Sequence, residues 1–168
     1  MPGAIAEDAR ADTNVEISRA GVRLSMQVDF YILETAAARE QLRTACRLAE
    51  KAWHKGHRVF IHTDSKETAR NLDDMLWTYR QDSFVPHALF APAGPDAEPV
   101  EPVLVGDGTG EPANIDVLIN LTESVPPFAD RSARIAEIVG AGESARRAGR
   151  VRYRDYRDRG ISIQQHNL

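Results

Sequence analysis

The chain has 168 residues and a mass of 18.6 kDa, the size of one ordinary domain, and 42% of its residues are hydrophobic, which suffices for one core. A single cysteine, Cys46, excludes an internal disulfide and a multi-cysteine zinc site. No stretch approaches the roughly 20 apolar residues that span a bilayer, and the first residues lack the hydrophobic run of a secretory signal, so we expect a cytoplasmic protein.

The charge of the chain is acidic overall but unevenly distributed. Its formal net charge is −4 and its pI is about 5.7, which disfavours general DNA binding because contact with the phosphate backbone needs a basic surface. Residues 143–159 contain seven arginines and three acids, a local net charge of +4 that leaves −8 for the rest of the chain. This basic segment is therefore the first candidate binding site.

The predicted elements alternate between strands and helices. Residues 1–25 show no sustained hydrophobic period and are interpreted as a flexible N-terminal extension. The pattern then predicts strands at 27–33, 57–63, 84–89, 102–105 and 115–121, and helices at 35–55, 64–77 and 143–159. Residues 128–139 fit either a helix or a strand, 91–102 is typical of a surface loop, and a last extended piece follows Gly160.

Local signals refine these boundaries and indicate the fold. Thr35 is expected to cap the first helix, and Asp64 with Glu67 resembles a capping box for the second. Pro86 favours the edge of a sheet for the strand that contains it. The alternation predicts a three-layer α/β/α fold with a mainly parallel sheet, Rossmann-like, formed by residues 26–168 as a single domain.

The sequence offers no recognisable catalytic, cofactor or metal site. The first junction between a strand and a helix (LETAAARE) contains no glycine, and the glycine-rich run 106–110 leads into another strand, so neither predicts a phosphate cradle. The five histidines lack the usual ligand spacings, and Cys46 falls on the apolar face of the first helix, where packing is expected. A small nucleotide-dependent enzyme on a Rossmann-like scaffold remains the alternative.

The last helix places a row of arginines on one face. Arg146, Arg150, Arg154 and Arg157 follow the spacing i, i+4, i+8 and i+11, with Tyr153 and Tyr156 beside them. Such a row is either solvated or a site for an anionic partner. An acidic or carboxylate-ended peptide suits the two interleaved tyrosines. Single-stranded nucleic acid is the third candidate, which the −8 elsewhere disfavours.

Several segments together resemble the chi subunit of bacterial DNA polymerase III. The most specific combination is Leu72-Asp73 with Leu76-Trp77, followed by Ser83-Phe84-Val85-Pro86-His87. The other matching segments are Val28-Asp29-Phe30-Tyr31-Ile32-Leu33, Lys55-Gly56-His57-Arg58-Val59 and Arg150-Val151-Arg152-Tyr153-Arg154-Asp155-Tyr156-Arg157. The resemblance covers about residues 27–165.

The resemblance implies a non-catalytic, replisome-associated subunit that joins the clamp loader, through the psi subunit or its equivalent, to the acidic C-terminal tail of single-stranded-DNA-binding protein (SSB). It implies no cofactor, and contact with DNA only through partners. The implied tail site comprises Trp77, Val139, Arg146, Arg150, Tyr153 and Arg154. The implied clamp-loader contact comprises Phe84, Val85 and Pro86. Because phenylalanine is commonly buried, a core position for Phe84 is the alternative.

Overall fold

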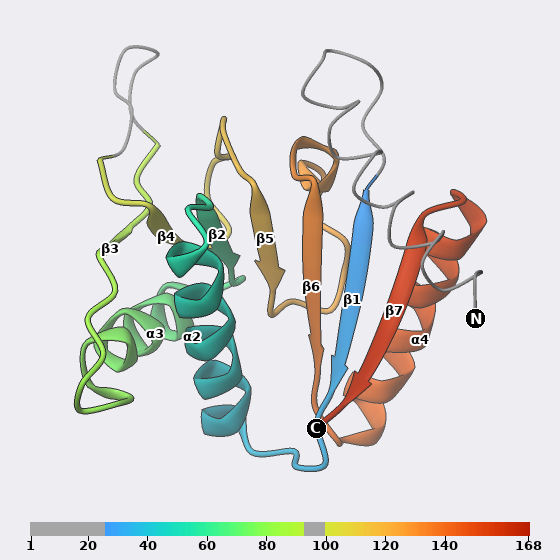
Figure 1. The fold of residues 1–168 in the computed structure, drawn as a ribbon. Helices are drawn as coiled ribbons and strands as arrows, with labels where there is room; N and C mark the ends of the chain where they lie inside the picture. The colour runs from blue at the N-terminus through green and yellow to red at the C-terminus, as the bar shows by residue number, and fades with distance from the viewer. Residues whose placement is uncertain (1–25, 93–99) are drawn as a thin grey trace, which may run out of the picture.

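The computed structural model describes residues 26–92 and 100–168, so the expected N-terminal extension and most of the expected loop at 91–102 lie outside the described residues. Seven strands form one sheet in the order β3-β4-β2-β5-β6-β1-β7, and every paired neighbour is parallel (Figure 1). The strands are β1 (Gln27–Ile32), β2 (Val59–His62), β3 (His87–Leu89), β4 (Val103–Gly106), β5 (Val117–Asn120), β6 (Arg134–Val139) and β7 (Ser162–Asn167). The helices are α2 (Ala38–His54), α3 (Lys66–Thr78), α4 (Glu143–Asp158) and the 3-10 turn η1 (Ala129–Arg131).

The predicted fold class is confirmed, and the differences lie at the ends of elements. The helix expected from Thr35 begins three residues later, at Ala38, and its N-cap makes no side-chain hydrogen bond. Ser65 caps α3 in place of Asp64, because its hydroxyl accepts the backbone N–H of Thr68 at 3.0 Å. The segment 128–139, which fitted either element, contains β6.

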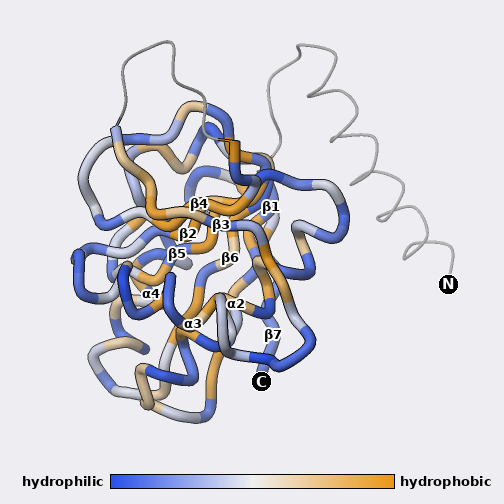
Figure 2. Tube along the Cα trace, turned by 90° about the vertical axis from the view of Figure 1, so that its left-hand side faces the viewer, coloured by the Kyte–Doolittle hydropathy of each residue, from blue (hydrophilic) through white to orange (hydrophobic). Residues whose placement is uncertain are grey.

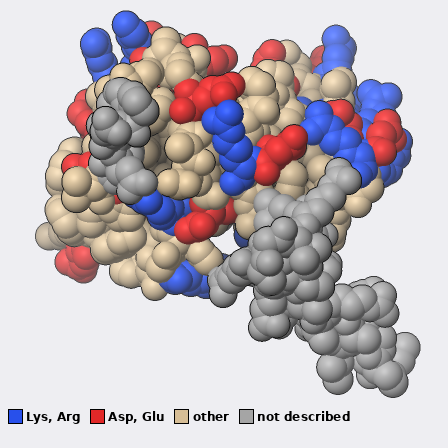
Figure 3. Space-filling view, turned by 90° about the horizontal axis from the view of Figure 1, so that it is seen from above, with Lys and Arg blue, Asp and Glu red and all other residues tan. Residues whose placement is uncertain are grey.

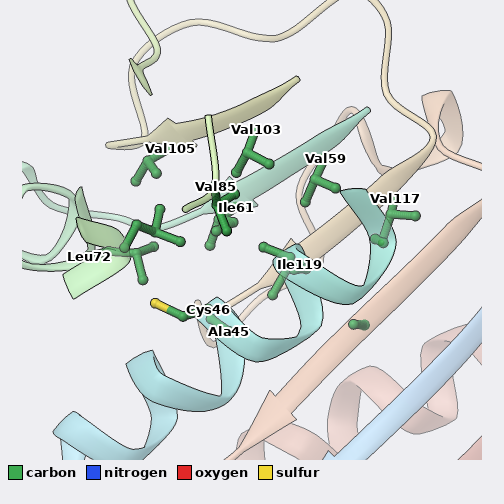
Figure 4. Close-up of a cluster of buried hydrophobic side chains, with 14 of the residues drawn as sticks. Ala45, Cys46, Val59, Ile61, Leu72, Val85, Val103, Val105, Val117 and Ile119 are labelled. Carbon is green, nitrogen blue, oxygen red and sulfur yellow. The ribbon is translucent and has the colours of Figure 1, made fainter. Parts of the chain in front are cut away.

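The two faces of the sheet are covered by different helices (Figure 1). On one face, α2 and α3 bury a cluster that includes Ala45, Cys46 and Leu72 against β2, β4 and β5 (Figure 4). On the other face, Tyr156 of α4 packs into a second cluster with Phe30 of β1. Figure 2 shows the hydrophobic segments gathered in the central strands, as expected for a parallel sheet that is covered on both faces.

Cys46 belongs to the first of these clusters, and its surroundings explain its presence. The residue is fully buried, and burial raises the pKa of its thiol to about 12. A thiol with so high a pKa carries almost no thiolate at neutral pH, and the thiolate is the nucleophilic form. The structure therefore agrees with the interpretation of Cys46 as a packing residue.

The sheet order places α3 and α4 at opposite ends of the sheet. Helix α3 packs beside β3 and β4, whereas α4 packs beside β6 and β7. In the described sheet, both outermost strands, β3 and β7, pair on one side only. Of the described helices, none is long and apolar enough to cross a membrane.

Candidate functional site

Helix α4 carries the predicted arginine row, and a buried polar network fixes its orientation. The carboxylate of Glu137 in β6 is fully buried and accepts hydrogen bonds from Arg152 Nε at 2.9 Å and from the Tyr156 hydroxyl at 2.6 Å. Asn120 at the end of β5 donates to the same carboxylate at 2.9 Å. Burial raises the pKa of Glu137, while the charge of Arg152 opposes that shift. Tyr156, predicted beside the exposed arginines, is therefore a buried residue. Arg152 and Tyr156 tie α4 to the sheet and determine which face of the helix is exposed.

The approach of α4 to the sheet also depends on a glycine. A Cβ at Gly149 would stand 3.1 Å from both γ-carbons of Val139 in β6, closer than most carbon contacts, so glycine lets helix and strand pack closely. Val139 itself is only 3% exposed. It was predicted as part of a surface site, and the structure places it beneath the helix, where it can act on a ligand only through α4.

The predicted arginines differ in what they contact. Arg146 donates from Nη2 to the carbonyl oxygen of Leu33 at 2.8 Å, which ties the start of α4 to the end of β1. Arg157 lies 3.7 Å from Asp158. Among the described residues, Arg150 and Arg154 contact no acid and make no hydrogen bond, and both are exposed. These two guanidinium groups are therefore available to an anion.

Tyr153 lies beside the two available arginines. Its ring centroid is 5.4 Å from that of Phe30 in β1, and 36% of the residue is exposed. One side of the ring thus packs on the core while the rest faces solvent. We call Arg150, Tyr153 and Arg154 the α4 surface. It combines cationic groups with an anchored aromatic ring, which suits a peptide that carries carboxylates and an apolar side chain.

Trp77 was predicted in the same site as the arginines, and the structure does not place it there. Trp77 lies near the end of α3, on the other face of the sheet from α4. Its ring centroid is 5.8 Å from that of Phe84 and 4.5 Å from that of His87. The sequence alone could not separate these groups, because their separation depends on the order of the strands.

Phe84 is exposed and forms an apolar patch with Trp77. The exposed fractions are 63% for Phe84 and 53% for Trp77, so a core position for Phe84 is ruled out. Val85 is fully buried and Pro86 is half-buried. Of the three residues predicted for the clamp-loader contact, Phe84 is therefore the most exposed, and Val85 is a core residue beneath it. We call Trp77 and Phe84 the α3 patch.

The segment that presents the α3 patch is held by contacts that the sequence did not reveal. The carboxylate of Glu50 in α2 accepts hydrogen bonds from Tyr79 at 2.5 Å, from Arg80 at 2.7 Å and from the Ser83 hydroxyl. Burial and the bond to Glu50 raise the pKa of Tyr79 to about 12, so its phenol remains a donor at neutral pH. The chain before Phe84 is thus anchored to α2.

His87 anchors the chain after Phe84. Its imidazole is fully buried, with Nδ1 2.6 Å from the carbonyl oxygen of Val85 and Nε2 3.1 Å from that of Asp73 in α3. Large apolar side chains on a supported segment lose little conformational freedom when a partner binds. The α3 patch has the properties of a protein-binding surface.

Neither the loop after β4 nor the face at the amino ends of the strands (Figure 3) resembles a phosphate-binding site. In the glycine-rich loop after β4, the carboxylate of Asp107 accepts the backbone N–H of Thr109 at 2.9 Å, so that N–H is already used and an acid occupies the loop. The described residues contain no cluster of potential metal ligands. Seen from the amino ends of the strands, basic and acidic side chains alternate over the visible surface (Figure 3), unlike a continuous phosphate-binding face.

Comparison with known proteins settles the family. The profile of the DNA polymerase III chi subunit, HolC, matches residues 26–164. The chain belongs to this family. It is 40% identical over 142 residues to the DNA polymerase III subunit chi of Pseudomonas aeruginosa, covering 84% of this chain and 96% of that relative. The Escherichia coli subunit is 31% identical, with 80% of this chain and 92% of the relative covered.

Solved structures show the same fold in unrelated sequences. S. cerevisiae Dbp5 bound to ADP and partner proteins matches with a TM-score of 0.58 at 10% identity, covering 83% of this chain and 41% of that chain. UvsW of T4 also matches with a TM-score of 0.58 at 10% identity, covering 86% and 42%. The chain spans about two fifths of each, and at this identity the likeness concerns the fold alone.

Membership of the chi family defines the cellular process. A chi subunit is an accessory subunit of DNA polymerase III and acts in DNA replication, and its partners belong to the clamp-loader complex. The sequence resemblance to this family is thereby confirmed. The nucleotide-dependent enzyme, which was the alternative, is not favoured.

Proposed function

We propose that this chi subunit is a non-catalytic adaptor with two separate protein-binding surfaces. The α4 surface binds the acidic C-terminal tail of SSB, and the α3 patch binds the psi subunit or its equivalent in the clamp loader. DNA is then contacted only through SSB. Residues 26–168 act as one chi-like domain, with 1–25 as an extension. The observation that carries this proposal is that Arg150 and Arg154 are exposed and have no acidic partner within residues 26–92 and 100–168, on a protein of net charge −4.

The proposed tail site has a centre, formed by two arginines, and three supporting residues. Arg150 and Arg154 receive carboxylates, because a charged hydrogen bond is stronger than a neutral one. Tyr153 supports the apolar side chain of the tail. Arg146 contributes charge at the start of the helix, although one of its nitrogens is bonded to Leu33. Val139 acts from below, by setting the distance between α4 and β6.

We add one residue, Trp77, to the proposed partner site. Trp77, first assigned to the tail site, lies against Phe84, and together they offer two aromatic anchors. Aromatic side chains dominate the energy of many interfaces. Pro86 follows in the chain and is half-buried, and Val85 supports the patch from the core. A partner segment with apolar side chains matches this chemistry.

A synthetic acidic peptide that ends in an aromatic residue with a free carboxylate tests the tail site. We expect calorimetric titration to give one binding site whose affinity falls as salt rises, because exposed charges are screened. The same peptide with an amidated C-terminus should bind more weakly, since one carboxylate is lost. Equal affinity for both peptides, or binding that does not respond to salt, would contradict the proposed ionic site.

Phe84→Ala should weaken binding to the clamp-loader partner by about 2 kcal/mol or more, roughly thirtyfold, because a central aromatic anchor is lost. The melting temperature should stay close to that of the wild type, since Phe84 is mostly exposed. Val151→Ala, on the exposed side of α4, is the matched control and should leave partner binding unchanged. If neither Phe84→Ala nor Val151→Ala weakened partner binding, Phe84 would not belong to the interface.

A further inference from the structure

Among the residues that the structure describes, the backbone groups on the outer edge of β7 have no strand partner. In the described sheet β7 pairs only with β1, and the backbone N–H of Leu168 donates to the carbonyl oxygen of Ile32 at 2.9 Å. Because backbone groups point to alternate sides along a strand, the even-numbered residues of β7 face β1. The N–H and C=O groups of Ile163, Gln165 and Asn167 therefore point away from the sheet.

Within the described part of the chain, this edge lacks the usual protection against pairing. Proteins commonly block an exposed edge strand with proline, lysine, a bulge or a covering segment. The strand sequence SIQQHN contains neither proline nor lysine and forms a regular ladder with β1. Its one titratable side chain is His166, whose Nε2 lies 2.9 Å from Oδ1 of Asp29 in β1. This imidazole therefore lies over β1 and not over the outer edge. The edge is six residues long and suited to accept another strand.

The α4 surface lies on the same side of the molecule as this edge. Helix α4 packs beside β7, and both elements stand at the same end of the sheet in Figure 1. Arg152 and Tyr156 turn towards β6, where they bond Glu137. Tyr153 instead contacts Phe30 of β1, so the arginines beside it flank the β1–β7 half of the sheet.

The spacing of the arginines matches that of an extended chain. Arg150 and Arg154 are one turn apart, which is about 6 Å along a helix axis. Alternate side chains of a strand point to the same face and are about 6.6 Å apart. Two acids at alternate positions of an extended peptide on the edge of β7 would thus meet the two guanidinium groups in register.

We propose that the acidic peptide bound by the α4 surface adds to the sheet as an eighth strand along β7, with alternate carboxylates on Arg150 and Arg154. The inference rests on the proposed tail site and adds its binding mode. Backbone hydrogen bonds to Ile163, Gln165 and Asn167 supply affinity, and the arginines select acidic sequences. A second copy of this chain is disfavoured at the edge, because symmetric pairing would bring two arginine rows together.

Amide hydrogen exchange measured by NMR on the full chain tests this mode. On addition of the acidic peptide, the amides of Ile163, Gln165 and Asn167 should exchange at least about tenfold more slowly, because they become hydrogen-bonded. The amides of Gln164 and His166 should change little, since they already face β1. Binding of the peptide without protection at the three outward amides would overturn the added strand while leaving the tail site intact.

Two further measurements sharpen the result. Gln165→Pro removes one outward N–H and should weaken the peptide about tenfold, whereas Gln165→Ala keeps the N–H and should bind as the wild type does. Equal affinity for both variants, with unchanged melting temperatures, contradicts the proposal. If the outward amides were protected from exchange without peptide, and more so at higher protein concentration, the edge would bind a second copy of the chain instead. Failure of the peptide to bind the wild type at all would remove the tail site itself.

Discussion

Arg152→Met is expected to lower the free energy of unfolding by about 3–5 kcal/mol, because it leaves the carboxylate of Glu137 buried without its cation. Both side chains are almost completely buried, and their atoms lie 2.9 Å apart. Urea denaturation at neutral pH measures the change. Arg147→Ala is the matched control, since its ion pair with Glu143 is exposed and such pairs contribute about 0–1 kcal/mol.

The double variant Glu137→Gln with Arg152→Met separates the charge from the packing. Removing both charges leaves no unpaired ion, so the double variant should be more stable than Arg152→Met alone. If Arg152→Met lowered the free energy of unfolding no more than Arg147→Ala does, the Glu137 network would not fix α4. The exposure of the arginine row would then need another explanation.

Arg150→Ala should weaken binding of an acidic, carboxylate-ended peptide by about 1.5–3 kcal/mol, roughly tenfold to a hundredfold. Arg150 is exposed, is one turn from Arg154 and has no acidic partner among the described residues. The charge-assisted contact to the peptide is therefore lost, while the fold keeps all its own contacts. Calorimetric titration at low salt gives the affinity, and the melting temperature should stay unchanged.

Arg70→Ala, an exposed arginine on α3, is the control because it removes the same charge at the other end of the sheet. It should bind the peptide nearly as the wild type does. If the two variants weaken binding equally, general charge attraction and not the α4 surface accounts for the affinity. Tight binding of mixed-sequence single-stranded DNA, abolished by Arg150→Ala alone, would assign the surface to nucleic acid.

The sequence predicted those features that depend on local pattern. The bounds of α4 followed from the arginine spacing and from Gly160, which has a positive φ of 76° just after the helix. Short β-branched runs predicted most of the strands, whereas β6 lies in a segment that fitted either a helix or a strand. Pro86 correctly indicated the edge of the sheet, although the strand expected at 84–89 begins only after it, at His87.

The features that the sequence missed depend on contacts between distant residues. The Glu137 network joins four residues from β5, β6 and α4, and none of its members has a distinctive local spacing. Trp77 and the arginines are both conspicuous in the sequence, yet the strand order puts the sheet between them. Likewise, alternation along 84–86 could not decide that Phe84 is exposed and Val85 buried.

The central claim is that one chain binds SSB and the clamp loader at the same time through two independent surfaces. The most direct measurement is co-sedimentation of the full chain with the clamp-loader complex and SSB on single-stranded DNA. The wild type should hold all components together. Arg150→Ala should keep the clamp loader and lose SSB, whereas Phe84→Ala should keep SSB and lose the clamp loader. A wild type that binds one partner only at the expense of the other, or variants that lose both together, would contradict the account.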